Sequence, residues 1–167
     1  MGRRKKKKSN LKETEQEESY TALKVLCVMS FIGFIISMLV DTGNYISFSS
    51  IEEMKMASNQ LPYEQIETQL EEWNEIGVDV SKKGLDRIAT MYAIRTLIDV
   101  LAMVGVVFMF YRIRVGYYIY VLFQFLYVIV PFLFFGSLAL FVVPYSSVAI
   151  TLIYVALFTS QQKKLTR

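Results

Sequence analysis

The chain has 167 residues, of which 54% are hydrophobic and 20% are charged, with a formal net charge of +3 and no histidine. Its apolar content exceeds the roughly 45–50% of ordinary soluble domains. Almost all of the charge lies in residues 1–24, 52–99 and 112–114 and in the last five positions. Long uncharged apolar stretches between charged ones exclude a soluble globular domain and a disordered chain. They predict an all-α, polytopic membrane protein with four spanning helices.

The residue inventory excludes several kinds of reactive site. Without histidine, the chain lacks the commonest metal ligand and general base. Its single cysteine, Cys27, excludes an intrachain disulfide and a CxxC pair, and it is expected to be a small buried side chain in an apolar run. The sequence has no phosphate-binding glycine loop and no nucleophile-elbow motif. We therefore expect no catalytic residue, cofactor or metal, and a protein that is not an enzyme.

Residues 1–20 form a mixed-charge head, which we expect to be disordered because it cannot bury enough apolar surface to fold alone. It would lie on the cytoplasmic side as a topogenic signal, and its basic run could also bind anionic lipid at about 1 kcal/mol per residue. The run is short and has no interleaved aromatic residues, so nucleic acid is not expected as a partner. The basic residues are Arg3, Arg4, Lys5, Lys6, Lys7 and Lys8.

The first predicted span covers residues 21–42, because some 20 apolar residues at a rise of 1.5 Å cross a hydrocarbon core of about 30 Å. Ser30, Gly33 and Ser37 recur along it every three or four residues, a spacing at which small residues let another helix approach closely. Gly43 suits the left-handed position that ends many helices.

An acidic extracytoplasmic segment, residues 43–89, is predicted to follow, with nine acidic and four basic residues. Pro62 and Gly77 suit the start and stop of an amphipathic helix over about 61–76. The apolar stripe of that helix would pack on the outer ends of the spans or on the lipid interface, or it would bind a partner. Its polar face carries glutamate, which favours a protein over anionic lipid as its neighbour. The stripe consists of Tyr63, Ile66, Leu70 and Trp73.

The remaining elements complete a four-span topology with both termini in the cytoplasm. This topology places thirteen of the eighteen basic residues inside, in agreement with the positive-inside rule. The turn between the third and fourth spans is either tight, at Gly136–Ser137, or wider, reaching Pro144–Ser147. The predicted elements are a span over 90–111, a basic cytoplasmic turn over 112–116, spans over 117–136 and 138–159, and a cytoplasmic tail over 160–167.

Four of the polar residues within the predicted spans form the candidate intramembrane cluster Asp41, Arg95, Asp99 and Gln124. Arg95 and Asp99 are four apart, so they share a helix face and can pair, and Asp41 lies at a comparable height. A deep ionised carboxylate should face other helices rather than lipid. The cluster is either a charge-pair clip between helices, with Gln124 in an interhelical hydrogen bond, or a site for an ion, a proton or a substrate.

Two stretches, VLCVMSFIGF (25–34) and RVGYYIYVLFQF (114–125), resemble a loose group of small bacterial four-helix membrane proteins of unknown function. The resemblance implies a bacterial inner-membrane location and identifies no catalytic residue. From the residues we expect a non-enzymatic accessory or assembly subunit that acts by association with a membrane-protein partner or with its own copies. The alternative is a small oligomeric transporter or channel that uses Asp99 and Arg95.

Overall fold

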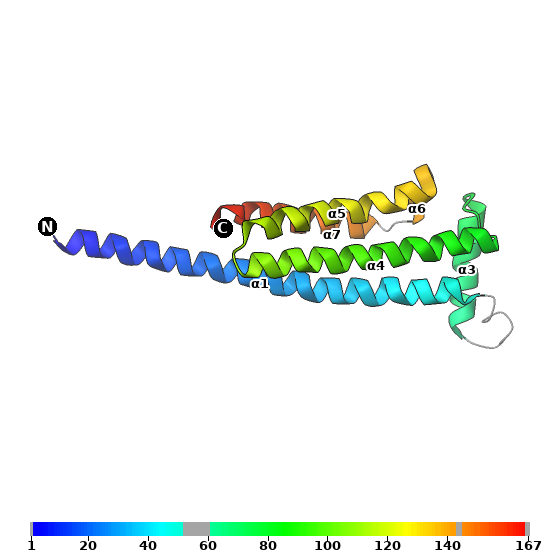
Figure 1. The fold of residues 1–167 in the computed structure, drawn as a ribbon, viewed down its shortest axis with the longest axis horizontal. Coiled ribbons are helices and arrows are strands. Elements are labelled where there is room, and N and C mark those ends of the chain that lie inside the picture. The colour runs from blue at the N-terminus through cyan, green and yellow to red at the C-terminus, as the bar shows by residue number, and fades with distance from the viewer. Residues whose placement is uncertain (1, 52–60, 143–144, 166–167) are drawn as a thin grey trace.

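The computed structural model describes residues 2–51, 61–142 and 145–165, with side chains from Tyr20 onwards except those of 61–65, 141–146 and 164. Every regular element in these ranges is helical, which confirms the all-α class. Figure 1 shows α4 lying between α1 and α5, with α7 returning beside α5. The elements are α1 (Gly2–Ser49), α3 (Leu61–Glu75), α4 (Lys82–Phe110), α5 (Arg114–Phe135), η1 (Gly136–Leu138), α6 (Ala139–Val142), α7 (Tyr145–Gln161) and η2 (Gln162–Lys164).

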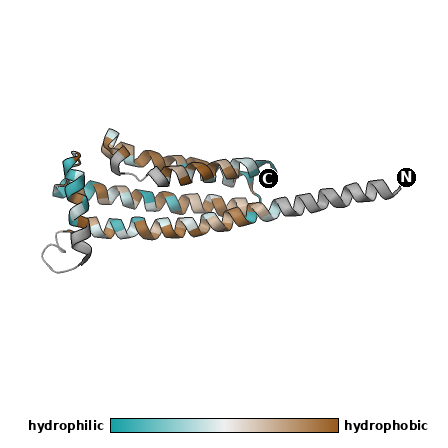
Figure 2. Cartoon of the chain, turned by 180° about the vertical axis from the view of Figure 1, so that it is seen from behind, coloured by the Kyte–Doolittle hydropathy of each residue, from teal (hydrophilic) through white to brown (hydrophobic). Residues whose placement is uncertain are grey.

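Three stretches are long and apolar enough to cross a membrane: Tyr20–Ser49, Lys82–Phe110 and Arg114–Leu138. Large apolar side chains are exposed on them, such as Leu39, which is 70% exposed, and Leu133, which is 76% exposed. Hydrophobic residues recur along the length of these helices (Figure 2). Exposing such surface to water is unfavourable by roughly 25 cal/mol per Å². The surrounding medium of these helices is therefore lipid, and the chain is a membrane protein.

The first helix is longer at both ends than the expected span over 21–42. Residues 2–20 continue α1 instead of being disordered. Their Lys, Glu and Gln residues are good helix formers, and extending an existing helix avoids the unfavourable nucleation step. At the other end the helix passes through Gly43, whose backbone is not left-handed, and stops at Ser49.

The second long helix also begins earlier than expected, at Lys82 rather than near residue 90. Ser81 caps it, because its hydroxyl oxygen accepts a hydrogen bond from the Gly84 N–H at 3.3 Å. Gly84 itself lies against the preceding loop, and a Cβ there would come within 1.8 Å of the Asp79 carbonyl oxygen. The acidic connection is thus shorter than the expected range 43–89.

The α4–α5 hairpin brings two backbones into direct contact. A Cβ added to Gly105 would lie 2.7 Å from the Tyr120 nitrogen, and one added to Gly116 would lie 2.5 Å from the Gly105 oxygen. Helices approach this closely only where side chains are absent. The close approach is therefore here and not at Gly33, since no described atom lies within 4 Å of a Cβ at that position.

The turn between α4 and α5 is tight. Arg112 adopts a left-handed backbone conformation with φ 64°, and its N–H donates to the Met109 oxygen at 2.9 Å. The Ile113 N–H donates to the Phe108 oxygen at 2.8 Å, so the two bonds form a Schellman motif. The Arg112 guanidinium carbon lies 3.7 Å from the centroid of the Tyr20 ring, so the expected basic turn closes against α1.

The expected fourth span over 138–159 is divided among several elements. After α5 ends, Gly136 has a positive φ of 56°, and η1 and α6 follow. The apolar helix α7 has 17 residues, or about 25 Å at the usual rise. It is shorter than the other three and contacts α1 and α5 sparsely.

Helix α3 crosses the end of the bundle opposite to the C-terminus (Figure 1). Its Trp73 stacks on Phe48 of α1 with ring centroids 5.6 Å apart, and Phe48 stacks on Tyr92 of α4 at 5.8 Å. Gly77 (φ 88°) ends the helix, as the Val78 N–H donates back to the Trp73 oxygen at 2.9 Å. The three stacked rings therefore hold α3 against the ends of α1 and α4.

Candidate functional site

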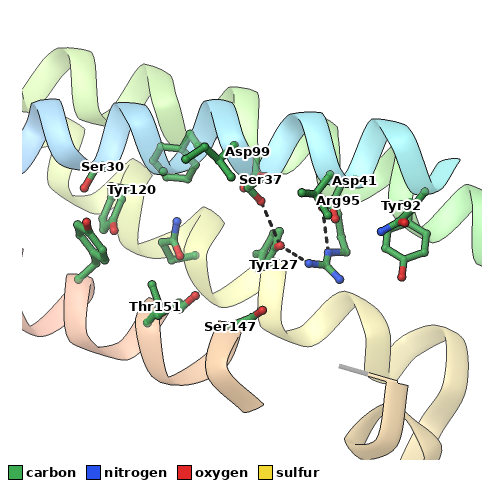
Figure 3. A pocket seen from close by; sticks show the side chains of 18 residues that line it. Ser30, Ser37, Asp41, Tyr92, Arg95, Asp99, Tyr120, Tyr127, Ser147 and Thr151 are labelled. Carbon is green, nitrogen blue, oxygen red and sulfur yellow. Dashed lines mark hydrogen bonds and ion pairs between the residues drawn. The ribbon is translucent and has the colours of Figure 1, made fainter. Parts of the chain in front are cut away.

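A cavity of about 440 Å³ lies between α1, α4, α5 and α7. Most of the residues that line it are polar or aromatic, and the labelled side chains in Figure 3 lie around the space between the helices. The lining residues are Ser30, Gly33, Phe34, Ile36, Ser37, Val40, Asp41 and Asn44 of α1, Tyr92, Arg95 and Asp99 of α4, Tyr120, Gln124 and Tyr127 of α5, and Ser147, Ile150, Thr151 and Tyr154 of α7.

Helical periodicity explains why these residues meet. Residues separated by three, four or seven positions share a helix face. On each of the four helices the polar lining residues follow this spacing, so each helix presents a polar stripe to the cavity and an apolar surface to the outside. The stripes are Ser30, Ser37, Asp41 and Asn44; Tyr92, Arg95 and Asp99; Tyr120, Gln124 and Tyr127; and Ser147, Thr151 and Tyr154.

Arg95 joins three of the helices. Its Nε lies 3.2 Å from the Asp41 Oδ2, and its guanidinium donates to the Tyr127 hydroxyl (Figure 3). The guanidinium carbon also lies 4.2 Å from the centroid of the Tyr127 ring. Arg95 and Asp41 are 6% and 2% exposed. Ion pairs removed from water are stable only with good partners, which Arg95 finds on α1 and α5.

The expected pairing of Arg95 with Asp99 is corrected by this geometry. Within the described part of the chain, the ion pair of Arg95 is with Asp41. Helical side chains lean toward the N-terminus of their helix, so a long side chain at position 95 extends away from position 99. Asp41, which was expected to be a second acceptor, is therefore the ion-pair acceptor.

Asp99 is left as the carboxylate without an ion pair in the cavity. It is 2% exposed, and its Oδ2 has no hydrogen-bond partner among the described residues. Ser37 lies beside Asp99 in Figure 3, and the Ser37 and Tyr127 hydroxyl oxygens are 3.2 Å apart. Buried polar atoms normally have a partner, so a carboxylate that lines a cavity and has an unsatisfied oxygen is a candidate ligand-binding group.

The charges of the cavity do not cancel. Asp41 and Arg95 neutralise each other, so an ionised Asp99 gives the cluster a net charge of −1. An isolated charge in a low-dielectric environment is strongly unfavourable, and binding a proton or a cation removes it. The arrangement therefore favours a positively charged ligand over an anion.

The structure brings all four residues of the predicted cluster to this one cavity, since Gln124 lines it as well and is 7% exposed. Most of the wall was not predicted from the sequence. Ser30 and Ser37 were expected to be helix-packing positions. The recurrence of polar residues on one face of each apolar helix is the signal that would have identified them.

The predicted partner-binding stripe lies elsewhere and is occupied within the chain. Ile66 and Trp73 are 9% and 6% exposed, and Leu70 packs against the same core. The Tyr63 side chain lies outside the described residues, as do those of the basic run from Arg3 to Lys8. The stripe thus packs on the ends of α1 and α4, the first of the two expected outcomes.

Among the described residues, no group of three or more Cys, Asp or Glu side chains could hold a metal ion. Cys27 is buried in an apolar core. Comparison of this chain with known protein families, with curated proteins and with solved structures found no match.

Proposed function

We propose that this chain is a multi-pass membrane transporter that binds a proton or small cation at Asp99 and passes it across the bilayer. The observation that supports this is a 2% exposed carboxylate in the wall of the cavity, beside a pair of charges that cancel, whose Oδ2 has no hydrogen-bond partner among the described residues. Ionisable groups within membranes are unfavourable and characteristically line ion and proton pathways. One deep carboxylate in a thin bundle makes a narrow pathway, so we expect the active form to be a homo-oligomer.

We further propose four crossings of a bacterial inner membrane, with α7 as the fourth and both termini in the cytoplasm. The distribution of charge supports this topology. Lys24 and Arg112 lie at one end of the bundle against Tyr20, and the C-terminal Gln162 reaches that end through Tyr118 at 3.4 Å. The glutamates of α3 are at the opposite end. Basic residues remain preferentially in the cytoplasm, so the end with Arg112 would be cytoplasmic.

Reconstitution into proteoliposomes tests the transport proposal. With a potassium gradient and valinomycin setting the membrane potential, a pH-sensitive dye inside the vesicles should report proton entry, and a parallel experiment with external methylammonium should report entry of a small cation. Asp99→Asn should abolish both fluxes, whereas Asp86→Asn, a change at an exposed position of the same helix, should leave them intact. Absence of flux with every variant and with the unaltered protein would refute the proposal.

The alternative proposal, an accessory subunit that acts by protein association, loses the surface on which it was based, because Trp73 and Ile66 are buried. Purification in mild detergent followed by mass spectrometry separates the two proposals. A stoichiometric membrane-protein partner together with an absence of flux would favour the accessory subunit, and flux from the purified chain alone favours the transporter.

A further inference from the structure

The mouth of the cavity and its floor differ in chemical character. Ile36, Val40 and Ile150 line the cavity and are 58%, 56% and 54% exposed, whereas Arg95 and Asp99 are at most 6% exposed. Gly33, the remaining exposed lining residue, is also apolar. Apolar side chains are therefore the most exposed part of the opening, the half-buried Ser37, Ser147 and Thr151 lie beside them, and the charged groups lie beneath.

This mouth faces the bilayer and not the water at either end. Its exposed residues lie in the middle of α1 and in α7, between which contacts are sparse. In Figure 3 the polar side chains lie between α1 and α7, with Ser147 and Thr151 on the far side of the space from Ser37. A molecule that enters between these helices therefore comes from the hydrocarbon region of the membrane.

The floor of the cavity selects for positive charge. Asp99 lines this space, and its Oδ2 has no hydrogen-bond partner among the described residues; the rings of Phe34 and Tyr120 line the same space. Aromatic faces attract ammonium groups, most strongly where water is excluded. The Asp41–Arg95 pair has no net charge, because the Arg95 guanidinium already neutralises the Asp41 carboxylate. Asp99 is therefore the carboxylate left to pair with a ligand cation.

From these observations we propose that the ligand is an amphipathic amine that enters from the bilayer, with its ammonium on Asp99 and its apolar tail passing between α1 and α7. This inference rests on the proposed role of Asp99 as a cation site and specifies the class of cation. A cavity of 440 Å³ lies within the roughly 300–1,000 Å³ range of small-molecule sites. A proton or an inorganic ion would make no contact with the apolar side chains at the mouth, whereas the tail of an amphipathic amine would.

Calorimetric titration of the protein in nanodiscs, with empty nanodiscs as the blank, tests the proposal. The probe is hexylamine, and hexanol and 1,6-diaminohexane are its matched comparisons. We expect saturable binding of hexylamine and at least about tenfold weaker binding of hexanol, since hexanol carries no charge to pair with the carboxylate. The diamine should also bind weakly, because its second charge cannot lie in the apolar mouth.

Two pairs of variants locate the site. Asp99→Asn should weaken hexylamine binding at least about tenfold, and Asp86→Asn should not change it. Gly33→Leu should block the mouth without a clash, because no described atom lies within 4 Å of a Cβ there. Gly43→Leu is the matched control, since Gly43 has the same open surroundings on α1 and does not line the cavity. Size-exclusion profiles and helical circular dichroism verify that each variant folds.

The outcomes separate this inference from the transport proposal. Equal binding of hexanol and hexylamine, equal binding of the diamine, or unchanged binding after Asp99→Asn or Gly33→Leu in folded protein would overturn the inference. Flux of protons or methylammonium without binding of hexylamine would overturn it and leave the transport proposal standing. Binding that depends on Asp99 without any flux would support the amine site and refute transport.

Discussion

Arg95 pairs with Asp41 on the neighbouring helix, Nε to Oδ2 at 3.2 Å, and not with Asp99 on its own helix. An arginine four residues before an acidic residue is the weaker order for an intrahelical pair, and the side chain leans the other way. The consequence is twofold. The pair connects α1 to α4, and it leaves Asp99 without an ion-pair partner among the described residues.

Breaking this pair should destabilise the fold. Asp41→Asn leaves the Arg95 guanidinium buried without its carboxylate, so we expect a loss of about 3–5 kcal/mol in the free energy of unfolding. The double variant Asp41→Asn/Arg95→Met should be more stable than Asp41→Asn alone, because it removes the unpaired charge. Unfolding in detergent, followed by circular dichroism, measures both. If the loss of stability in the double variant equals the sum of the losses in Asp41→Asn and Arg95→Met, the two residues are not coupled.

The contact between Gly105 and Gly116 should tolerate no side chain. Gly105→Ala and Gly116→Ala each place a Cβ within 2.7 Å of backbone atoms of the opposite helix. We expect the hairpin to separate and stability to fall by about 1–3 kcal/mol, as in overpacked cores. Gly33→Ala and Gly43→Ala are the controls, since they meet open space and alanine favours helix. Equal effects at all four positions would contradict the packing argument.

Apolar runs and charge patterning were sufficient to predict the helical membrane class and the residues of the intramembrane cluster. The helix ends were predicted less well. Gly43 resembles a helix terminator in sequence, yet its backbone stays helical because the residues up to Ser49 pack through Phe48 on α3 and α4. Tertiary contacts of this kind override local propensity.

The partners within the cluster could not be predicted from spacing alone. Arg95 and Asp99 satisfy the i, i+4 rule, but which helix supplies the acceptor depends on how α1 and α4 are rotated about their axes. Tyr127 was not assigned to the cluster, because tyrosines in a membrane span also suit headgroup positions. Only the assembled helices place its hydroxyl beside Arg95.

Trp73 is the only tryptophan of the chain, so its fluorescence reports directly on the packing of α3. Because Trp73 is 6% exposed and stacked on Phe48, we expect blue-shifted emission and weak quenching by iodide. Phe48→Ala should shift the emission to the red and increase quenching, while Tyr111→Ala, at a residue that is 70% exposed, should not. Strong quenching in the unaltered protein would instead indicate that the stripe is free to bind a partner.

Asp79 should make the start of α4 sensitive to acid. Hydrogen bonds from Ser81, including its backbone N–H at 2.9 Å, hold the pKa of Asp79 below its usual value of 3.8. A carboxyl group whose pKa is lowered on folding contributes its full stabilisation above pH 3.8 and loses it as the pH falls through the folded-state pKa. We therefore expect the amides after Ser81 to lose protection from hydrogen exchange below about pH 4. After Asp79→Asn the protection should be lower and independent of pH, and a variant with the same acid response as the unaltered protein would show that another group is responsible.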